Sequence, residues 1–278
     1  MLFLKNTLSG IFAGRWTDIR RPVSKPLLLI LGALPVVVLL LAWSLLTSGK
    51  AEERVISPVI LPSPAEVASS FHSLWFDAQL SRSVVASTKR VILGFAAGLV
   101  VAFPLGILMG TFSRANAMFG PLAVFLAYLP IPALVPLTMS LFGIDELQKV
   151  MFLGLAFLIY LLPLFVGAVG DVDNVFLQTA YTLGATRWQL VSRVLFPVAF
   201  PQIFQAMRLG FGVGWTYIIL AEMVAADRGL GQIIIVAQRR GPKEHIYLVL
   251  LVIVAIAYLT DRLWIWLGRK LFPYQEAR

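Results

Sequence analysis

Six long apolar segments limit what this chain of 278 residues can fold into. They cover residues 27–46, 91–111, 119–142, 150–169, 207–226 and 246–266. Each is close to the ~20 mainly apolar residues that a helix needs to cross the hydrocarbon core of a bilayer. Only 13% of all residues are charged, against about 25% in an average soluble domain. The sequence therefore predicts an all-α membrane protein with six transmembrane helices.

Charge and cysteine content exclude several classes of function. The net charge is +9, but the Lys and Arg residues lie mostly between apolar segments, where they set topology and form no continuous nucleic-acid-binding face. Because the chain has no cysteine, disulfides, thiolate chemistry and Cys-ligated metals are excluded. The two histidines, His72 and His245, lie far apart in polar segments. We therefore expect no metal site and no catalytic histidine.

The first apolar segment is interpreted as an uncleaved anchor. Residues 1–26 carry five basic residues and are long for the basic start of a signal peptide, and no small-residue cleavage site follows the apolar run. Six spans place both termini on one side of the membrane. The basic residues flanking the spans favour the cytoplasm for both ends.

The expected organisation follows from these spans. It comprises a cytoplasmic segment (1–26), the first span (27–46), a periplasmic or interfacial segment (47–90), a five-helix core (91–268) with a cytoplasmic loop at 171–205, and a cytoplasmic tail (269–278). Within 47–90, Ser63 or Pro64 can begin a short amphipathic helix with Val67 and Trp75 on its apolar side. Such a helix is expected to lie at the membrane interface.

The third span contains three prolines within seven residues, Pro130, Pro132 and Pro136. An interior proline removes a helix hydrogen bond and clashes with the preceding turn. In lipid such a break is tolerated only where protein or a water-filled cavity satisfies the freed groups. We expect a kinked or interrupted helix packed inside the bundle, either as a static kink or as a gating element of the pathway. Met139 on the same span is a further pathway candidate.

The fifth span carries both small residues and a carboxylate. Gly210 and Gly214 have the spacing that lets two membrane helices approach closely. Glu222 lies late in the span, either facing a cavity or partner or sitting at the outer interface, where its cost is small. Trp215 and Tyr217 are grouped with it as candidate pathway or gating residues.

A polar stretch, QTAYTLGATRWQLVSRVLFP, interrupts the apolar pattern between the fourth and fifth spans. Asp173 can cap a helix over residues 174–183, and Gly184 is the residue type that ends helices in a left-handed conformation. Thr186 and Gln189 have the spacing of a capping box for a second helix. Pro197 and Pro201 are expected to limit that second helix at about residue 196.

The sequence therefore predicts two short helices joined by a glycine corner, which we call the elbow (residues 174–196). The elbow is too polar for a seventh span and suits docking by a second protein. An ordinary connector is the alternative.

This stretch resembles the EAA signature of permease subunits in bacterial ATP-binding cassette (ABC) importers. The signature reads E-A-A, three residues, G, nine residues, I, one residue, L-P. The corresponding residues here are Gln178-Thr179-Ala180, Gly184, Val194 and Phe196-Pro197. Gln178 and Thr179 depart from the pattern. The stretches LPSPAEV, YLPIPALVPLTMSLFGIDELQKV and AEMVAADRGLG are similar to the nitrate, sulfonate, taurine and bicarbonate branch, so the resemblance extends from about residue 57 onward.

The resemblance implies a type I ABC importer permease in the bacterial inner membrane, with the elbow as a coupling helix seated in a cytoplasmic ATPase. It places at or near that contact Gln178, Ala180, Tyr181, Gly184, Ala185, Thr186 and Arg187. The implied partners are a second copy of the chain, two ATPase subunits, a periplasmic or lipoprotein solute-binding protein, and membrane lipid. No nucleic-acid partner is expected.

The chain itself is expected to be no enzyme and to bind no cofactor. It has no G-x-x-x-x-G-K-[ST] phosphate loop, so ATP-Mg is expected on the partner ATPase. An intramembrane enzyme needs a nucleophile–base pair that these spans do not offer. An ion-coupled secondary transporter usually shows internal repeats, and none is clear here.

The resemblance favours a small anion of the sulfonate/taurine, nitrate or bicarbonate class as the substrate. An aromatic acid or a pyrimidine is the alternative substrate class.

Overall fold

The computed structural model describes residues 23–275, apart from residues 51, 53 and 225. Most of the expected N-terminal segment and the end of the tail lie outside these residues. Within the described chain all regular secondary structure is helical. Five helices are long and apolar enough to cross a membrane, and a sixth span is present if one bent helix pair is counted. The predicted all-α membrane fold is thus confirmed. The chain divides into two compact units, Met1–Ser70 and Phe71–Arg278.

The first unit contains one long apolar helix, α2 (Lys25–Leu46), with no side chain buried within the unit. A helix that is apolar all round and has no protein cover belongs in lipid. After α2 the chain turns back, and the Trp43 indole N–H donates to the carbonyl oxygen of Pro62 at 2.9 Å. This bond ties the end of the span to the start of the next helix, α3 (Pro64–Ser69).

Helix α3 begins as the sequence predicts, with Ser63 as N-cap and Pro64 in the first turn. Ser63 and Glu66 form a capping box, in which the Ser63 N–H donates to a Glu66 carboxylate oxygen at 2.7 Å. Arg54 holds the same carboxylate through both terminal nitrogens, at 2.9 and 3.0 Å. The Arg54 guanidinium, followed by the Ser63 backbone N–H, lowers the pKa of Glu66 to about 2.

We expect Arg54→Gln to raise the pKa of Glu66 toward the ordinary value of about 4.3. The pKa of Glu66 is depressed in the fold, so its stabilising contribution is full above the ordinary pKa and is lost as the pH falls through about 2. Carboxyl carbon NMR of the labelled chain in micelles measures this titration. An unchanged midpoint in the Arg54→Gln variant would show that the ion pair is not formed in solution.

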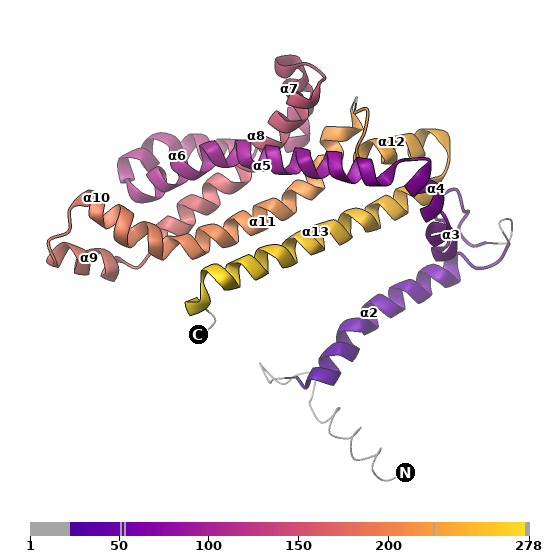
Figure 1. Cartoon of the computed structure of the whole chain (residues 1–278), viewed down its shortest axis with the longest axis horizontal. Coiled ribbons are helices and arrows are strands. Elements are labelled where there is room, and N and C mark those ends of the chain that lie inside the picture. The colour runs from indigo at the N-terminus through magenta and orange to yellow at the C-terminus, as the bar shows by residue number, and fades with distance from the viewer. Residues whose placement is uncertain (1–22, 51, 53, 225, 276–278) are drawn as a thin grey trace, which may run out of the picture. The chain divides into compact units, whose positions relative to one another are not determined.

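The second unit carries the remaining elements. In chain order these are α4 (Phe71–Phe76), α5 (Leu80–Thr111), α6 (Ser113–Ala127), the 3-10 turn η1 (Ile131–Ala133), α7 (Leu134–Phe142), α8 (Glu146–Gly170), α9 (Asn174–Thr182), α10 (Arg187–Leu190), the π-helical turn η2 (Val191–Leu195), α11 (Phe196–Met223), α12 (Leu230–Arg240), α13 (Lys243–Leu271) and the 3-10 turn η3 (Pro273–Gln275). Within this unit α9 and α10 lie at one end, and α4 and α12 lie at the opposite end (Figure 1).

Helix α8 packs against α5 along a row of glycines. An added Cβ at Gly94, Gly98, Gly106 or Gly110 of α5 would lie 2.5 to 2.7 Å from the Cβ atom of an α8 residue. Such distances leave no room for any side chain, so the two backbones meet closely. Gly210 and Gly214 of α11 also face α8, but an added Cβ there would meet the far ends of the Leu161 and Phe157 side chains, so these glycines make room for side chains.

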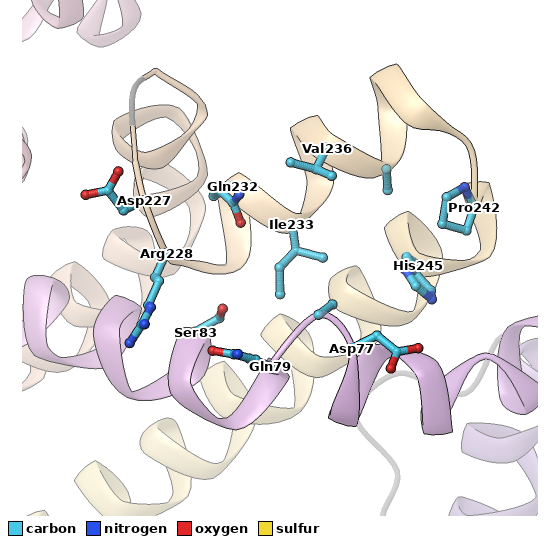
Figure 2. Close-up of a pocket in the computed structure, with 12 residues that line it drawn as sticks. Asp77, Gln79, Ser83, Asp227, Arg228, Gln232, Ile233, Val236, Pro242 and His245 are labelled. Carbon is cyan, nitrogen blue, oxygen red and sulfur yellow. The ribbon is translucent and has the colours of Figure 1, made fainter.

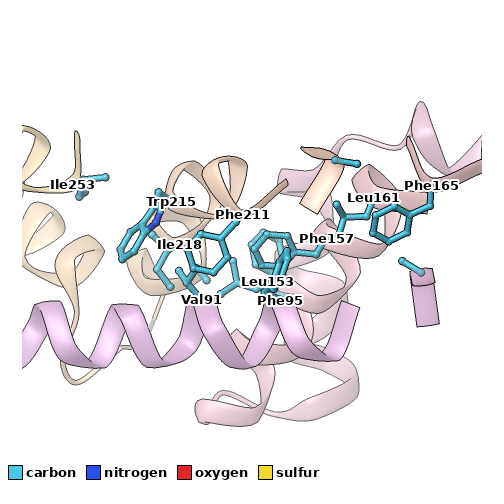
Figure 3. Packing of buried hydrophobic residues seen from close by; sticks show 14 of the residues in the cluster. Val91, Phe95, Leu153, Phe157, Leu161, Phe165, Phe211, Trp215, Ile218 and Ile253 are labelled. Atoms are coloured by element: carbon cyan, nitrogen blue, oxygen red, sulfur yellow. The ribbon is translucent and has the colours of Figure 1, made fainter. Parts of the chain in front are cut away.

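Aromatic side chains fill the space beside these glycine contacts (Figure 3). The ring of Phe95 meets the rings of Phe157 and Phe211 edge to face, each with centroids 5.2 Å apart. Trp215 lies in the same core at 1% exposure. Edge-to-face pairs add about 0.5–1.5 kcal/mol beyond area burial. The core therefore joins α5, α8 and α11 into one packed body.

Several of the expected spans have different boundaries in the structure. Helix α5 begins at Leu80, eleven residues before the expected start at 91. The extra turns carry Ser83, Ser87 and Arg90, all buried, and a sequence pattern based on apolar residues does not extend a span through such polar groups.

The expected third span, 119–142, is divided. Helix α6 and the segment Ile131–Phe142 meet at an angle of 89°. Pro130 precedes η1 and Pro132 lies within it, where neither can support a continuous helix. The expected interruption is therefore present. However, no side chain of α6 is buried within the single chain, so the expectation of packing inside the bundle is not met for α6.

The expected end of the second elbow helix at Pro197 is wrong. The chain stays helical from Arg187 to Met223, through both Pro197 and Pro201. The π-helical turn η2 lies immediately before Pro197. Its wider i→i+5 ladder changes the hydrogen-bond register where the proline ring would otherwise strike a carbonyl. The elbow therefore runs directly into the next span without a break.

Candidate functional site

The corner of the elbow is set by backbone geometry. Gly184 has a φ of +80°, which a residue with a Cβ adopts only at a cost. The Ala185 N–H donates to Ala180 and the Gly184 N–H donates to Tyr181, both at 3.0 Å. These two bonds form a Schellman motif, which closes α9 and satisfies its last carbonyls.

The elbow has two arms, of which the first is α9 and the second begins with α10. The second arm starts at a capping box, as the sequence predicts. The Thr186 N–H donates to the Gln189 side-chain oxygen at 2.9 Å, and the Gln189 N–H returns a longer bond to the Thr186 hydroxyl at 3.4 Å. At the other arm, the Asp173 carboxylate accepts from the Val175 N–H at 3.0 Å. Both short helices therefore have their free N–H groups capped by their own residues.

Large apolar side chains stand exposed around this corner. Leu183 is 82% exposed, Trp188 79% and Tyr181 56%. Rigid, exposed aromatic residues are the usual anchors of protein interfaces. Of the predicted coupling residues, Gln178, Tyr181, Gly184, Thr186 and Arg187 are exposed, Ala185 is half-buried and Ala180 is buried. Neither Leu183 nor Trp188 is among the predicted coupling residues, although an apolar residue on each side of a glycine corner was a usable signal.

The structure does not bring the pathway candidates together. Pro130 and Pro132 are exposed in the bend between α6 and α7, Pro136 is exposed within α7, and Met139 packs partly buried on the core. Trp215 is a core residue, and its indole N–H has no hydrogen-bond partner in the described part of the chain. Tyr217 packs against the same core. A pathway role for these residues stays a prediction.

Glu222 belongs to an ionic cluster with Ser87, Arg90 and Glu146, of which Glu146 is exposed and the other three are buried. The Glu222 side chain is fully buried, and its carboxylate accepts from Arg90 at 2.7 Å and from the Ser87 hydroxyl at 2.7 Å. Arg90 also donates through Nε to Glu146 at 2.7 Å. Arg90 and Glu222 are 132 positions apart in the chain.

The loop before α12 is tied to this cluster. The Gly231 N–H donates to Glu222 at 2.9 Å, the Leu230 N–H donates to Ser87 at 3.0 Å, and Arg90 donates to the Arg228 carbonyl at 2.6 Å. Gly229 has a φ of +147°, and an added Cβ there would lie 2.4 Å from the Glu222 carboxylate. Only glycine fits this close approach.

Burying a carboxylate without a counter-charge costs free energy. The ion pair with Arg90 and the hydrogen bonds from Ser87 and Gly231 offset this cost for Glu222. The cluster joins α5 to the end of α11, the start of α8 and the start of α12, because its four members and their backbone partners come from these elements. Ser87 and Arg90 were missed by sequence reasoning, which placed both in a polar segment. Ser83, Ser87 and Arg90 recur at i, i+4 and i+7, a helical spacing that could have signalled one buried face.

A cavity of about 290 Å³ is lined by residues of α12, of the start of α5 and of the segments beside them (Figure 2). Its lining includes Asp77, Gln79, Ser83, Arg228 and His245. It carries groups of both charges, and no three His, Asp or Glu residues gather as a metal site within the described residues.

Residues 102–272 match the family described as the binding-protein-dependent transport system inner membrane component. The match covers more than half of the chain. The chain belongs to this family. A probable ABC transporter permease of Brucella abortus (strain 2308) is 33% identical over 84% of this chain and 91% of its own length. The taurine transport system permease of Escherichia coli (strain K12) is 31% identical over 92% of each chain.

The solved structures agree on the fold. An inward-facing structure of the MetNI methionine ABC transporter superposes with a TM-score of 0.63 at 20% identity, covering 72% of this chain and 98% of that one.

Further relatives are named as aliphatic sulfonate, nitrate and bicarbonate permeases. The resemblance read from the sequence is confirmed, and the chain is a multi-pass permease subunit of the inner membrane. Permeases of this family are transport subunits and not enzymes, and the ATPase is a separate subunit.

Proposed function

We propose that this permease forms the translocation pathway for a small anion in an ATP-driven importer. The substrate class is sulfonate or taurine, nitrate, or bicarbonate. A solute-binding protein on the outer side delivers the solute, and two copies of the chain form the pathway. Alternating access is driven by two cytoplasmic ATPase subunits that dock on the elbow, and both termini lie in the cytoplasm. The proposed substrate class is supported by the similarity to the taurine permease of Escherichia coli, because the two sequences align over nearly the whole chain.

One observation carries the coupling role of the elbow. Leu183 and Trp188 are about four-fifths exposed on either side of a corner that is fixed by Gly184 and the Thr186 cap. An unsupported surface loop would leave such side chains mobile, whereas the two caps hold them in place. Because η2 joins the second arm to α11 without a break, movement of the corner is transmitted along a continuous helix.

The orientation is supported by the positions of the elbow and α12. They lie at opposite ends of the second unit, so spans between them separate the two surfaces (Figure 1). The end with the elbow faces the ATPase in this proposal. The end with α12 then faces the solute-binding protein.

Gly184→Val tests the coupling role. The open space around Gly184 admits a side chain, but a φ of +80° is strained for valine. We therefore expect the backbone of the corner to shift and the ATPase to bind the elbow less well. In proteoliposomes holding the whole transporter, the rates of uptake and of substrate-stimulated ATP hydrolysis should fall at least tenfold. A tenfold change corresponds to about 1.4 kcal/mol of free energy. The variant should still insert in the membrane.

Gly212→Val is the matched control, because Gly212 also has open space around it but lies in α11 without a positive φ. Normal uptake by Gly184→Val would refute the coupling role. Uptake by the permease alone, driven by an ion gradient, would instead establish a secondary transporter. Binding of an aromatic acid or a pyrimidine by the partner solute-binding protein would replace the proposed substrate class.

A further inference from the structure

A second cavity, of about 860 Å³, lies between the elbow and the ends of the spans. Its lining includes Thr111, the last residue of α5, and Gly170, the last residue of α8. Arg187, the first residue of the helical segment Arg187–Met223, also lines the cavity. Since three spans begin or end here, the cavity lies at the level where the chain leaves the hydrocarbon, which is the level of the lipid headgroups.

The polar groups of this cavity are suited to an anion. Arg114 of α6 and Arg187 of α10 both line it, and neither forms an ion pair with a described residue. No Asp or Glu occurs among the described lining residues. Asp173 lies nearby in the sequence, but its carboxylate caps the first turn of α9. The two arginines of the cavity therefore have no direct ion-pair partner among the described residues.

An unpartnered polar atom provides an independent observation. The Thr111 hydroxyl is buried and has no hydrogen-bond partner in the described structure, which is rare and costs free energy. It lies beside the first turn of α6, where Ser113, Arg114 and Ala115 also line the cavity and no side chain caps the helix. Backbone N–H groups at such a helix start bind phosphate oxygens well.

Most of the remaining lining residues are apolar, and Asn174 and Tyr181 are the polar ones among them. The apolar walls include Leu108, Phe112, Leu177, Leu190, Val191 and Leu195. A freely soluble anion gains little from such walls, whereas the glycerol and first acyl carbons of a lipid bury against them. Basic pockets between membrane helices are recognised sites for anionic headgroups.

We infer that this cavity binds the phosphodiester headgroup of an anionic phospholipid in the leaflet on the elbow side. The phosphate lies between Arg114 and Arg187, and the Thr111 hydroxyl donates to one of its oxygens. Since Arg114 belongs to α6 and Arg187 to the second arm of the elbow, the bound lipid braces the elbow against the ends of α5 and α6. Arg187 is also one of the residues placed at or near the proposed ATPase contact, so lipid binding is measured on the chain without the ATPase, where a failure of the coupling role does not affect it.

Lipid binding by the purified full-length chain tests this inference. In neutral detergent, native mass spectrometry should show one short-chain phosphatidylglycerol retained per chain, in preference to phosphatidylcholine. Arg114→Gln and Arg187→Gln should each weaken phosphatidylglycerol binding about fivefold, since each removes one basic group near the headgroup. Thr111→Val keeps the side-chain shape and should weaken binding by removing the hydroxyl alone.

Arg193→Gln is the matched control, because Arg193 is exposed six residues further along the same helical segment and does not line the cavity. Its binding should equal that of the unaltered chain. Equal retention of phosphatidylglycerol and phosphatidylcholine would overturn the inference. So would unchanged binding in both arginine variants. Displacement of the lipid by millimolar inorganic phosphate would reassign the cavity to a free oxyanion.

Discussion

Glu222→Ala is expected to lower the free energy of unfolding by about 3–5 kcal/mol, because it removes the fully buried carboxylate partner of Arg90 and leaves that guanidinium only the exposed Glu146. Arg90 is only 4% exposed, so water cannot replace the lost carboxylate. The same change removes the acceptor of the Gly231 N–H and of the Ser87 hydroxyl. Unfolding in an SDS titration, followed by circular dichroism, measures the loss.

Glu146→Gln is the matched control for this prediction. Glu146 holds the same guanidinium, but its side chain is 65% exposed. Water and salt screen an exposed ion pair, so we expect about 0–1 kcal/mol for this change. Equal losses for Glu222→Ala and Glu146→Gln would contradict the buried pair. In the double variant Arg90→Met/Glu222→Gln, the loss should be smaller than the two single losses added, because the two residues interact directly.

Gly98→Leu is expected to prevent α5 and α8 from packing. An added Cβ at Gly98 would lie 2.7 Å from the Phe157 Cβ and 2.9 Å from the Gly154 carbonyl oxygen. A backbone oxygen cannot move aside as a flexible side chain can, so the helices must separate. Even Gly98→Ala should cost about 1–3 kcal/mol, the usual cost of overpacking. Size-exclusion chromatography should show Gly98→Leu aggregated, and the SDS titration gives the cost of Gly98→Ala.

Gly167→Ala on α8 is the opposite case. An added Cβ there meets no atom within 4 Å, so the change should be neutral or should stabilise the helix by up to about 1 kcal/mol. A stable, monodisperse Gly98→Leu variant would show that α5 and α8 do not meet along this glycine row. If Gly98→Ala and Gly167→Ala had the same effect, helix propensity rather than close packing would control both positions.

The helix caps and the glycine corner of the elbow were predictable from neighbouring residues. Asp173, Gly184 and Thr186 act through hydrogen bonds that span at most five positions, so their residue types alone indicated caps and a corner. Pro197 misled the same reasoning. Its usual effect was cancelled by the π-helical turn before it, and no residue in VSRVL indicates that turn.

The sequence by itself determined that this chain crosses a membrane, roughly where it does so, and that a capped polar elbow separates two of the spans. Hydrophobic length and capping act within one helix or turn, so they can be read from adjacent residues. Only the tertiary structure decided that Arg90 and Glu222 form a pair, that the glycines of α5 face α8, and that a cationic cavity lies behind the elbow. These features join residues up to 132 positions apart, and a buried charge is stable only when the whole fold brings its partner into contact.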